Sequence, residues 1–232
     1  MKRRQVLSRA GVLAALTFAP SVPAAAGEQS LFDGKTLTGW RAKDPSYWLV
    51  EDGAIVGRST PDHPCTRNQF LEWTGGPLSD FELTLEFQLL GGPEANSGIQ
   101  IRSKIHPDGA AEGYQADIDR TGKYLGGLYD EHTPRGFLAQ RGEQTEIARN
   151  GDRKTVEIGD SEELRQLFRP DGWNEYRIVA TGPRIQLHLN GRPTADVVDE
   201  EEGQADRTGT LALQLHFGPP TTVRFRSIRL KT

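Results

Sequence analysis

Hydrophobic and polar residues alternate along much of the chain, which predicts many short β-strands. The clearest example is Phe81–Leu90, FELTLEFQLL, in which every second residue is apolar and Glu, Thr and Gln stand between them. Because successive side chains of a strand point to opposite faces, one face of this segment enters a core. Thr210–Phe217, TLALQLHF, follows the same rule, with Phe217 expected on the apolar side.

Pairs of turn residues show where neighbouring strands reverse. An Asp-Gly pair separates Tyr47–Val50 from Ala54–Gly57, and an Asn-Gly pair separates Arg184–Leu189 from Pro193–Val198. Both pairs favour the tight turns of β-hairpins, so the strands they join are expected to be antiparallel.

The remaining chain adds more strands and little helix. Alternation predicts further strands at Asn68–Trp73, Ser97–Arg102, Trp173–Ala180 and Val223–Leu230. Ser161–Phe168 is the single helix candidate, with Ser161 as its N-cap. Thr133–Gly159 is rich in Arg, Gly, Glu and Gln and is expected to be an irregular surface excursion.

Composition supports an all-β protein. The chain has 232 residues with 26 Gly and 14 Pro, a turn-rich balance that suits many short strands. We find no internal repeat or linker between residues 27 and 232, so this segment is expected to be one domain. Two antiparallel sheets packed face to face, a β-sandwich, is the simplest architecture. The only cysteine, Cys65, excludes an internal disulfide.

The first 26 residues have the layout of an export signal. A basic start is followed by the apolar segment Gly11–Val22 and by three alanines that end at Ala26. Arg3 and Arg4, followed after one residue by Val-Leu-Ser, resemble a twin-arginine signal. We therefore expect cleavage after Ala26 and an exported, periplasmic or secreted, protein. No apolar run reaches the roughly 18–20 residues that a membrane span needs.

An unusual set of polar side chains lies in Gly113–His132. Gln115, Asp117 and Asp119 alternate with apolar residues, so all three share one face of a strand. A second strand, Leu125–Glu131, follows after a turn. It ends in Tyr-Asp-Glu, so Glu131 and the preceding Asp point to opposite faces and only one of them can share that face.

Other strands carry the same kind of polar face. Gln100 and Arg102 share one face of their strand, and Gln214 and His216 share one face of theirs. Amides, an Arg, carboxylates and a His suit a carbohydrate site, because sugar hydroxyls need bidentate donors and acceptors. A solvated outer face of a sandwich remains the alternative, although such a face usually prefers Lys, Glu and Thr.

Seven motifs, in order along the chain, resemble those of a known family. They are LFDGKTLTGW, NSGIQIRS, GYQADI, GLYDE, GWNEYRI, HLNGRP and LQLHFGPPTTVRFRSIRL. Together they cover about Leu31–Thr232 and resemble the 3-keto-disaccharide hydrolase family, also called 3-keto-glucoside lyase/hydratase domains. The resemblance implies a concanavalin A-like sandwich, or jelly roll, a fold that glucanases and lectin modules share.

The resemblance also implies a reaction on sugars that are already oxidised at C3. The ketone acidifies the C2 proton; a base removes it, the C1 substituent leaves, and water adds back. Such a site needs a base, an acid for the leaving oxygen and an electrophile near the C3 oxygen, a role that a divalent metal ion can also fill. A separate sugar 3-dehydrogenase would have to supply the oxidised sugar, because this chain lacks a dinucleotide fingerprint.

Eight residues are the candidates for this chemistry. The proposed catalytic residues are Asp117, Glu131, His216 and Arg102, and the proposed substrate-binding residues are Gln115, Tyr129, Gln214 and Trp173. Which carboxylate would be the base stays open at this point, and Asp117, Glu131 and His216 could instead hold a metal ion.

Structural roles compete with these assignments. Asp117 could simply pair with Arg102, His216 could be a hydrogen-bonded sheet residue, and Tyr129 and Trp173 could be core residues. A lectin-like binding module and an ordinary glucanase are the competing functions on the same fold. The net charge of −4 argues against a nucleic-acid partner, and no nucleotide cofactor is expected.

Overall fold

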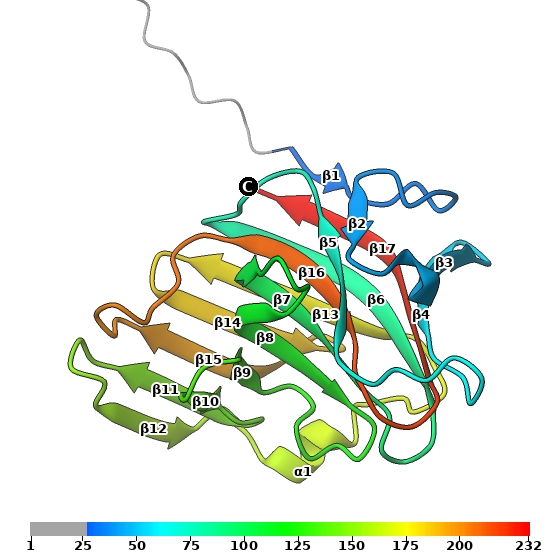
Figure 1. Ribbon diagram of the computed structural model, residues 1–232. Helices are drawn as coiled ribbons and strands as arrows, with labels where there is room; N and C mark the ends of the chain where they lie inside the picture. The colour runs from blue at the N-terminus through cyan, green and yellow to red at the C-terminus, as the bar shows by residue number, and fades with distance from the viewer. Residues whose placement is uncertain (1–26) are drawn as a thin grey trace, which may run out of the picture.

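The computed structural model describes residues 27–232, so the expected export signal and its cleavage site lie outside the described residues. Two β-sheets pack face to face and form the sandwich that the alternation predicts (Figure 1). In the described part of the chain, no helix is long and apolar enough to cross a membrane.

The larger sheet has ten strands in the order β12-β11-β15-β14-β13-β6-β17-β4-β3, with β1 added at β17. Its strands are β1 (Gln29–Ser30), β3 (Trp48–Glu51), β4 (Ala54–Arg58), β6 (Phe81–Gly91), β11 (Glu143–Ile147), β12 (Arg153–Glu157), β13 (Asn174–Thr181), β14 (Arg184–Leu189), β15 (Arg192–Asp199) and β17 (Thr221–Lys231).

The smaller sheet has seven strands in the order β10-β9-β8-β7-β16-β5-β2. Its strands are β2 (Trp40–Ala42), β5 (Gln69–Trp73), β7 (Asn96–Ile105), β8 (Ala111–Asp119), β9 (Leu128–Glu131), β10 (Gly136–Ala139) and β16 (Thr210–Leu215). Figure 1 shows this sheet in front of the larger one, with its outer face toward the viewer.

The turn chemistry of the two expected hairpins is confirmed. Asp52 and Gly53 between β3 and β4, and Asn190 and Gly191 between β14 and β15, all have positive φ angles between 49° and 81°. Such angles are what a two-residue hairpin turn requires, and Gly, Asn and Asp tolerate them best.

The expectation of an irregular excursion at Thr133–Gly159 is wrong. This segment contains the short strands β10, β11 and β12, and β11 pairs in parallel with β15. All the other strand pairs are antiparallel. Every residue of β12 is exposed, so its alternation cannot be read from hydrophobicity, and the pairing of the backbone alone reveals the strand.

The core lies between the sheets and follows the predicted alternation. The apolar residues of β6, from Phe81 to Leu89, are at most 5% exposed, and Tyr114, Ala116 and Ile118 of β8 are fully buried against them. Trp40 and Trp48 also belong to this core. Burial of such side chains contributes roughly 1.5–3 kcal/mol each, so the core stabilises the sandwich without a disulfide.

Three local expectations need correction. The helix α1 (Ser161–Arg165) begins one residue earlier than expected, because Asp160 and not Ser161 is the N-cap and accepts the cap hydrogen bond, from the amide of Glu163 at 2.8 Å. The short 3₁₀ helix η1 (Pro45–Tyr47) was not expected. Phe217 is 52% exposed, because β16 ends at Leu215 and the alternation does not continue past that point.

Candidate active site on the outer face of the seven-stranded sheet

The polar residues of β8 and β9 meet on the outer face of the smaller sheet. Gln115 lies opposite Tyr129 in the register, and both β-strands turn their apolar side chains to the core. The resulting cavity has a volume of about 320 Å³. Its walls contain no Lys or Arg and are formed by Asn68, Asn96, Gln115, Asp117, Tyr124, Tyr129, Glu131, Phe137, His216 and Phe217.

Asp117 is the terminal acceptor of a chain of hydrogen bonds. Ser103 Oγ donates to Gln100 Oε1 at 2.7 Å, Gln100 Nε2 donates to Gln115 Oε1 at 2.7 Å, and Gln115 Nε2 donates to Asp117 Oδ1 at 2.6 Å. The side-chain amides of Gln100 and Gln115 are both buried, so the neighbouring hydrogen bonds fix their orientation. The Asp117 carboxyl is thereby held with Oδ1 occupied, and no described residue donates to Oδ2.

Burial controls the protonation of Asp117. The side chain is 5% exposed, and removal from water raises the pKa of Asp117 well above its usual value. The hydrogen bond from Gln115 lowers this pKa, while the charges of Glu131 and Asp119 raise it further. The alternative role for Asp117, a pair with Arg102, is absent, so no cation offsets the cost of the buried charge.

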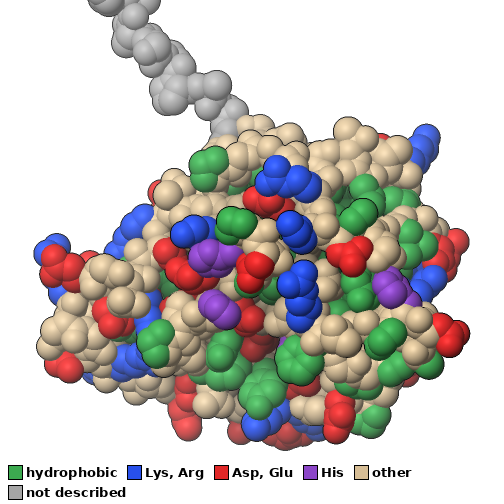
Figure 2. All heavy atoms as spheres, in the orientation of Figure 1, with side chains coloured by type: hydrophobic (Ala, Val, Ile, Leu, Met, Phe, Trp, Pro, Cys, Tyr) green, Lys and Arg blue, Asp and Glu red, His purple; other side chains and the backbone are tan. Residues whose placement is uncertain are grey.

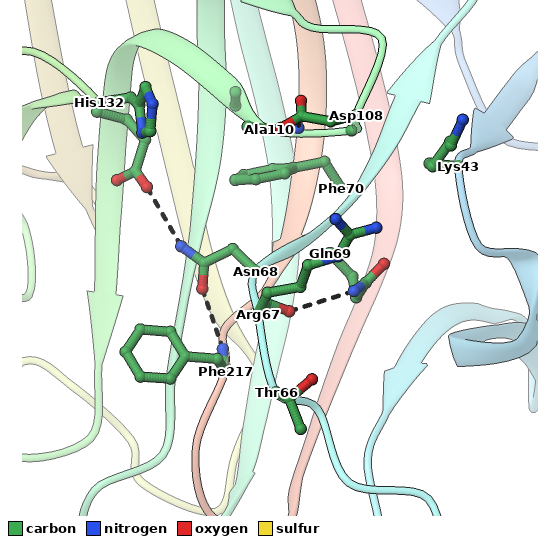
Figure 3. Close-up of a pocket in the computed structure, with 13 residues that line it drawn as sticks. Lys43, Thr66, Arg67, Asn68, Gln69, Phe70, Asp108, Ala110, His132 and Phe217 are labelled. Carbon is green, nitrogen blue, oxygen red and sulfur yellow. Dashed lines mark hydrogen bonds between the residues drawn. The ribbon is translucent and has the colours of Figure 1, made fainter.

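Glu131 is positioned by a residue that the sequence did not single out. Asn68 Nδ2 donates to Glu131 Oε1 at 3.2 Å, while Asn68 Oδ1 accepts from the amide of Phe217 at 3.0 Å (Figure 3). Burial raises the pKa of Glu131, and the Asn68 hydrogen bond opposes this only in part. Asp130, the residue before it, points to the other face and pairs with Arg135, as the alternation predicts.

His216 enters the same cavity from the end of β16. Its Nδ1 lies 2.6 Å from the carbonyl oxygen of Phe217, and its ring stacks on the Phe217 ring at 4.5 Å. A carbonyl oxygen can only accept, so Nδ1 carries the proton and Nε2 keeps its lone pair. Burial lowers the pKa of His216, which favours this neutral tautomer.

Gln214 is buried beside the cavity and does not line it. The register places it between Gly98 and Phe70, and Gly98 in turn lies opposite Asp117. Neither amide atom of Gln214 has a hydrogen-bond partner among the described residues. Gly98 leaves the room that Gln115 occupies, since a Cβ there would lie 2.5 Å from the Gln115 amide carbon.

Aromatic rings form one wall of the cavity. Tyr129 packs edge to face on Phe137 with ring centres 5.0 Å apart, and Tyr124 stacks on the same Phe137 at 5.4 Å. Tyr129 is only partly buried, so it is not a core residue and its ring is available to a ligand. Asp119, by contrast, only caps the turn after β8, because its carboxylate accepts from the amides of Thr121 and Tyr124.

Arg102 is not part of this cavity, which corrects the sequence-based prediction. A bulge between Ile101 and Lys104, with a φ of 47° at Arg102, breaks the alternation and turns the side chain away from the polar face. The buried guanidinium donates to the carbonyl oxygens of Ser79 and Gly182 and thereby ties the two sheets together.

Trp173 also lies elsewhere. Its ring sits under the guanidinium of Arg226, 3.9 Å from the ring centre, and near that of Arg224 at 5.5 Å. Arg226 projects from the outer face of the ten-stranded sheet, where it binds Glu86. The expected role of Trp173 as a platform at the same site is therefore wrong.

The candidate residues do not form a metal-binding set. Among residues 27–232, no group of three or more His, Cys, Asp or Glu side chains is arranged to hold a metal ion. Asp117, Glu131 and His216 line one cavity without forming such a group.

Sequence reasoning missed Asn68, Phe137 and the positioning role of Gln100. Asn68 precedes β5 and carries no motif, and Phe137 belongs to a segment that was expected to be irregular. Gln100 could have been found, because it shares the alternation of its strand and its amide suits a network with Gln115.

The model of the family described as 3-keto-alpha-glucoside-1,2-lyase-like domain matches residues 27–231 of the chain. A search of curated proteins found no match to the chain. Solved structures share the fold at low identity: a protein of unknown function with a galectin-like fold from Bacillus subtilis (TM-score 0.58, 11% identity, 84% of this chain and 90% of that one) and the Bacillus licheniformis beta-glucanase (0.54, 9%, 91% and 99%). A third is a carbohydrate-binding module from Bacillus subtilis (0.55, 16%, 84% and 96%).

Proposed function

The chain belongs to the 3-keto-alpha-glucoside-1,2-lyase-like family, and on this basis we propose that it cleaves 3-keto-glycosides by elimination at C1–C2 followed by hydration. The observation that carries the proposal is one cavity lined by His216, whose pKa is lowered, and by Asp117 and Glu131, whose pKa values are raised, with no Lys or Arg in its walls. Family membership and the carbohydrate-related proteins of the same fold support a carbohydrate-active enzyme.

His216 is the proposed base. Its Nε2 lone pair accepts the C2 proton, which the neighbouring ketone acidifies, and the C2–H electron pair forms the enolate. The Nδ1–H bond to the Phe217 carbonyl stabilises the imidazolium that forms. A pKa below the usual value keeps the ring neutral before the reaction.

The two carboxyls are the proposed acids. Asp117, with Oδ1 held by Gln115, carries its proton on Oδ2 and donates a hydrogen bond to the C3 oxygen as negative charge develops there. The protonated Glu131 gives its proton to the glycosidic oxygen when the C1–O bond breaks. This leaves a C1=C2 double bond. The imidazolium exchanges its proton with solvent, water adds at C1 and gives one proton to the Glu131 carboxylate, and the imidazolium delivers a solvent-derived proton to C2.

Asp117, and not the candidate Arg102, thus supplies the electrophile that this chemistry needs near the C3 oxygen. Gln115 holds its orientation, and Tyr129 is the proposed contact for the sugar ring. Export of the protein and supply of its substrate by a separate sugar 3-dehydrogenase remain parts of this proposal.

Paired substrates test the proposal. Purified protein is incubated with a 3-keto-glucoside and with its unoxidised parent, each with and without a chelator, and products are followed by NMR. We expect cleavage of the keto sugar only. Loss of turnover in chelator would add a divalent ion to the mechanism, and cleavage of the parent would contradict the proposal in favour of ordinary glucanase chemistry.

A lectin-like binding module is the second candidate, since the fold also occurs in a carbohydrate-binding module. A module needs the amides and aromatics of the cavity but no titratable base. If the wild type binds sugar but cleaves no keto sugar, and His216→Gln leaves the sugar affinity unchanged, the binding module is the better account.

A further inference from the structure

A second cavity adjoins the proposed active site. It has a volume of about 390 Å³ and shares Asn68, Glu131 and Phe217 with the first cavity (Figure 3). Glu131 therefore stands at the boundary of the two. If the proposed function holds, a keto sugar in the first cavity places its glycosidic oxygen at Glu131, and the leaving group extends into the second cavity.

Aromatic and small side chains shape this second cavity for a ring. Phe70 lies at its floor and packs with Ala111 outside the main core, and Phe217 stands at its edge with half of its surface exposed. A ring-shaped ligand in this cavity would cover the exposed face of Phe217, and aromatic side chains pack well on ring faces.

Two cations of the cavity wall are available to a ligand. Lys43 and Arg67 line the cavity, and neither forms an ion pair with any carboxylate among the described residues. Two carboxyls also belong to the wall. Asp108 accepts from the amide of Ala110 at 3.1 Å, and the charge of Arg67 helps to lower its pKa without an ion pair between them; Glu131 accepts from Asn68.

The neighbouring Arg41 differs from Lys43 and Arg67, because it forms an ion pair with a carboxylate on the same face of the sheet. Arg41 lies two residues before Lys43 and outside the second cavity, and it forms an ion pair with Glu72. Figure 2 shows Lys and Arg side chains in a column down the middle of this face. Lys43 and Arg67, which line the cavity, have no such ion pair among the described residues.

We propose that the second cavity is the leaving-group subsite and that it selects a ring carrying a carboxylate. The ring packs against Phe217 and Phe70, and the carboxylate binds Lys43 and Arg67. A uronic acid unit and a carboxylated phenol share this chemistry. The carboxylate takes no part in bond breaking; the leaving oxygen receives its proton from Glu131, as in the proposed function.

Matched pairs of 3-keto-glucosides test the subsite. One pair has glucuronic acid or glucose as the leaving unit; the other has 4-carboxyphenol or the neutral 4-carbamoylphenol. We expect kcat/KM to favour the acidic member by about tenfold, the size of a charge-assisted contact, and the preference to weaken as salt increases. A preference in the sugar pair alone would identify a uronic acid unit.

Variants locate the effect. The double variant Lys43→Gln and Arg67→Gln is expected to remove the preference, so that kcat/KM for the acidic member of each pair falls to that of the neutral member. Arg41→Gln removes one positive charge from the same face but not from the cavity, and it should leave the preference unchanged.

Two failures are distinguishable. Equal kcat/KM values for acidic and neutral members in the wild type, with keto sugars still cleaved, would overturn the subsite and leave the proposed function standing. Absence of turnover on all four 3-keto substrates would overturn the proposed function and the subsite with it.

Discussion

The carboxyl groups of the proposed active site and the carboxylates on the outer face of the ten-stranded sheet have opposite surroundings. On the ten-stranded sheet, Glu82 pairs with Arg177 at 2.9 Å and Glu86 pairs with Arg226 at 3.0 Å. These hydrogen bonds lower the pKa values of Glu82 and Glu86. On the seven-stranded sheet, Asp117 meets amides and no cation, and burial raises its pKa.

The difference separates a structural face from a functional one. Cross-strand ion pairs at partly exposed positions are weak but favourable, so the ten-stranded sheet gains from its charges. A buried carboxyl without a cation destabilises the fold, and such groups are concentrated at sites where proton transfer is needed. On the seven-stranded sheet this destabilising carboxyl, Asp117, lines a cavity, which is why we place the chemistry there.

The largest effect is expected from removal of the base. His216→Gln should lower kcat on a 3-keto-glucoside by about 10²–10⁴, the usual contribution of a positioned general base. His188 provides the matched control, because burial also lowers its pKa but it lies on the ten-stranded sheet. Steady-state kinetics measures kcat for both variants. An equal loss of kcat in His188→Gln and His216→Gln would contradict the assignment of His216 as the base.

Removal of the proposed acid should depend on the leaving group. Glu131→Gln is expected to lower kcat by about 10² for a sugar leaving group and far less for 4-nitrophenol, which departs without a proton. Glu86→Gln on the other sheet should change neither rate. An equal loss on both substrates would show that Glu131 positions the sugar and does not supply a proton.

Stability should respond to pH with opposite signs on the two faces. The pKa of Asp117 is higher in the folded state than in the unfolded chain, so its contribution is fully present below about pH 3.8 and is lost as the pH rises through the folded-state pKa. Asp117→Asn should therefore raise the free energy of unfolding at pH 7 relative to the wild type, and this gain should vanish in acid.

Glu86 should show the reverse. Its lowered pKa gives stability above the unfolded value, near pH 4.5, that is lost as the pH falls through the folded-state pKa. Glu86→Gln should cost less than about 1 kcal/mol at neutral pH, because the pair is partly exposed. Urea unfolding from pH 3 to pH 7 measures both variants, and two curves of the same sign would contradict the distinction between the faces.

The smallest effect is expected from Gln100, which reaches Asp117 only through Gln115. Gln100→Leu removes the donor to Gln115 Oε1, so Gln115 holds Asp117 less firmly. Loss of one such hydrogen bond corresponds to about fivefold in kcat. Gln186→Leu, on the ten-stranded sheet, is the control and should leave kcat unchanged.

Alternation predicted the parts of the fold in which one face is buried. It identified β6 and the β8–β9 pair, and with them Gln115, Asp117, Tyr129 and Glu131 on one face. The sequence could not show that a bulge at Arg102 ends the alternation, because a bulge depends on pairing with a neighbouring strand.

The residues that complete the cavity could not be found for a different reason. Asn68 acts through contacts with Glu131 and Phe217, which are distant in sequence and meet only when β5, β9 and β16 are assembled. Trp173 was assigned to the site because its type suits a sugar, whereas its strand lies in the other sheet.

Exchange of the C2 proton tests the central claim most directly. Wild-type protein is incubated with a 3-keto-glucoside in deuterium oxide, and recovered substrate and product are examined by NMR. The account predicts deuterium at C2 of the released 3-keto sugar and none there with His216→Gln. Release of 3-keto sugar that keeps its original C2 hydrogen would contradict elimination and with it the assignment of this face.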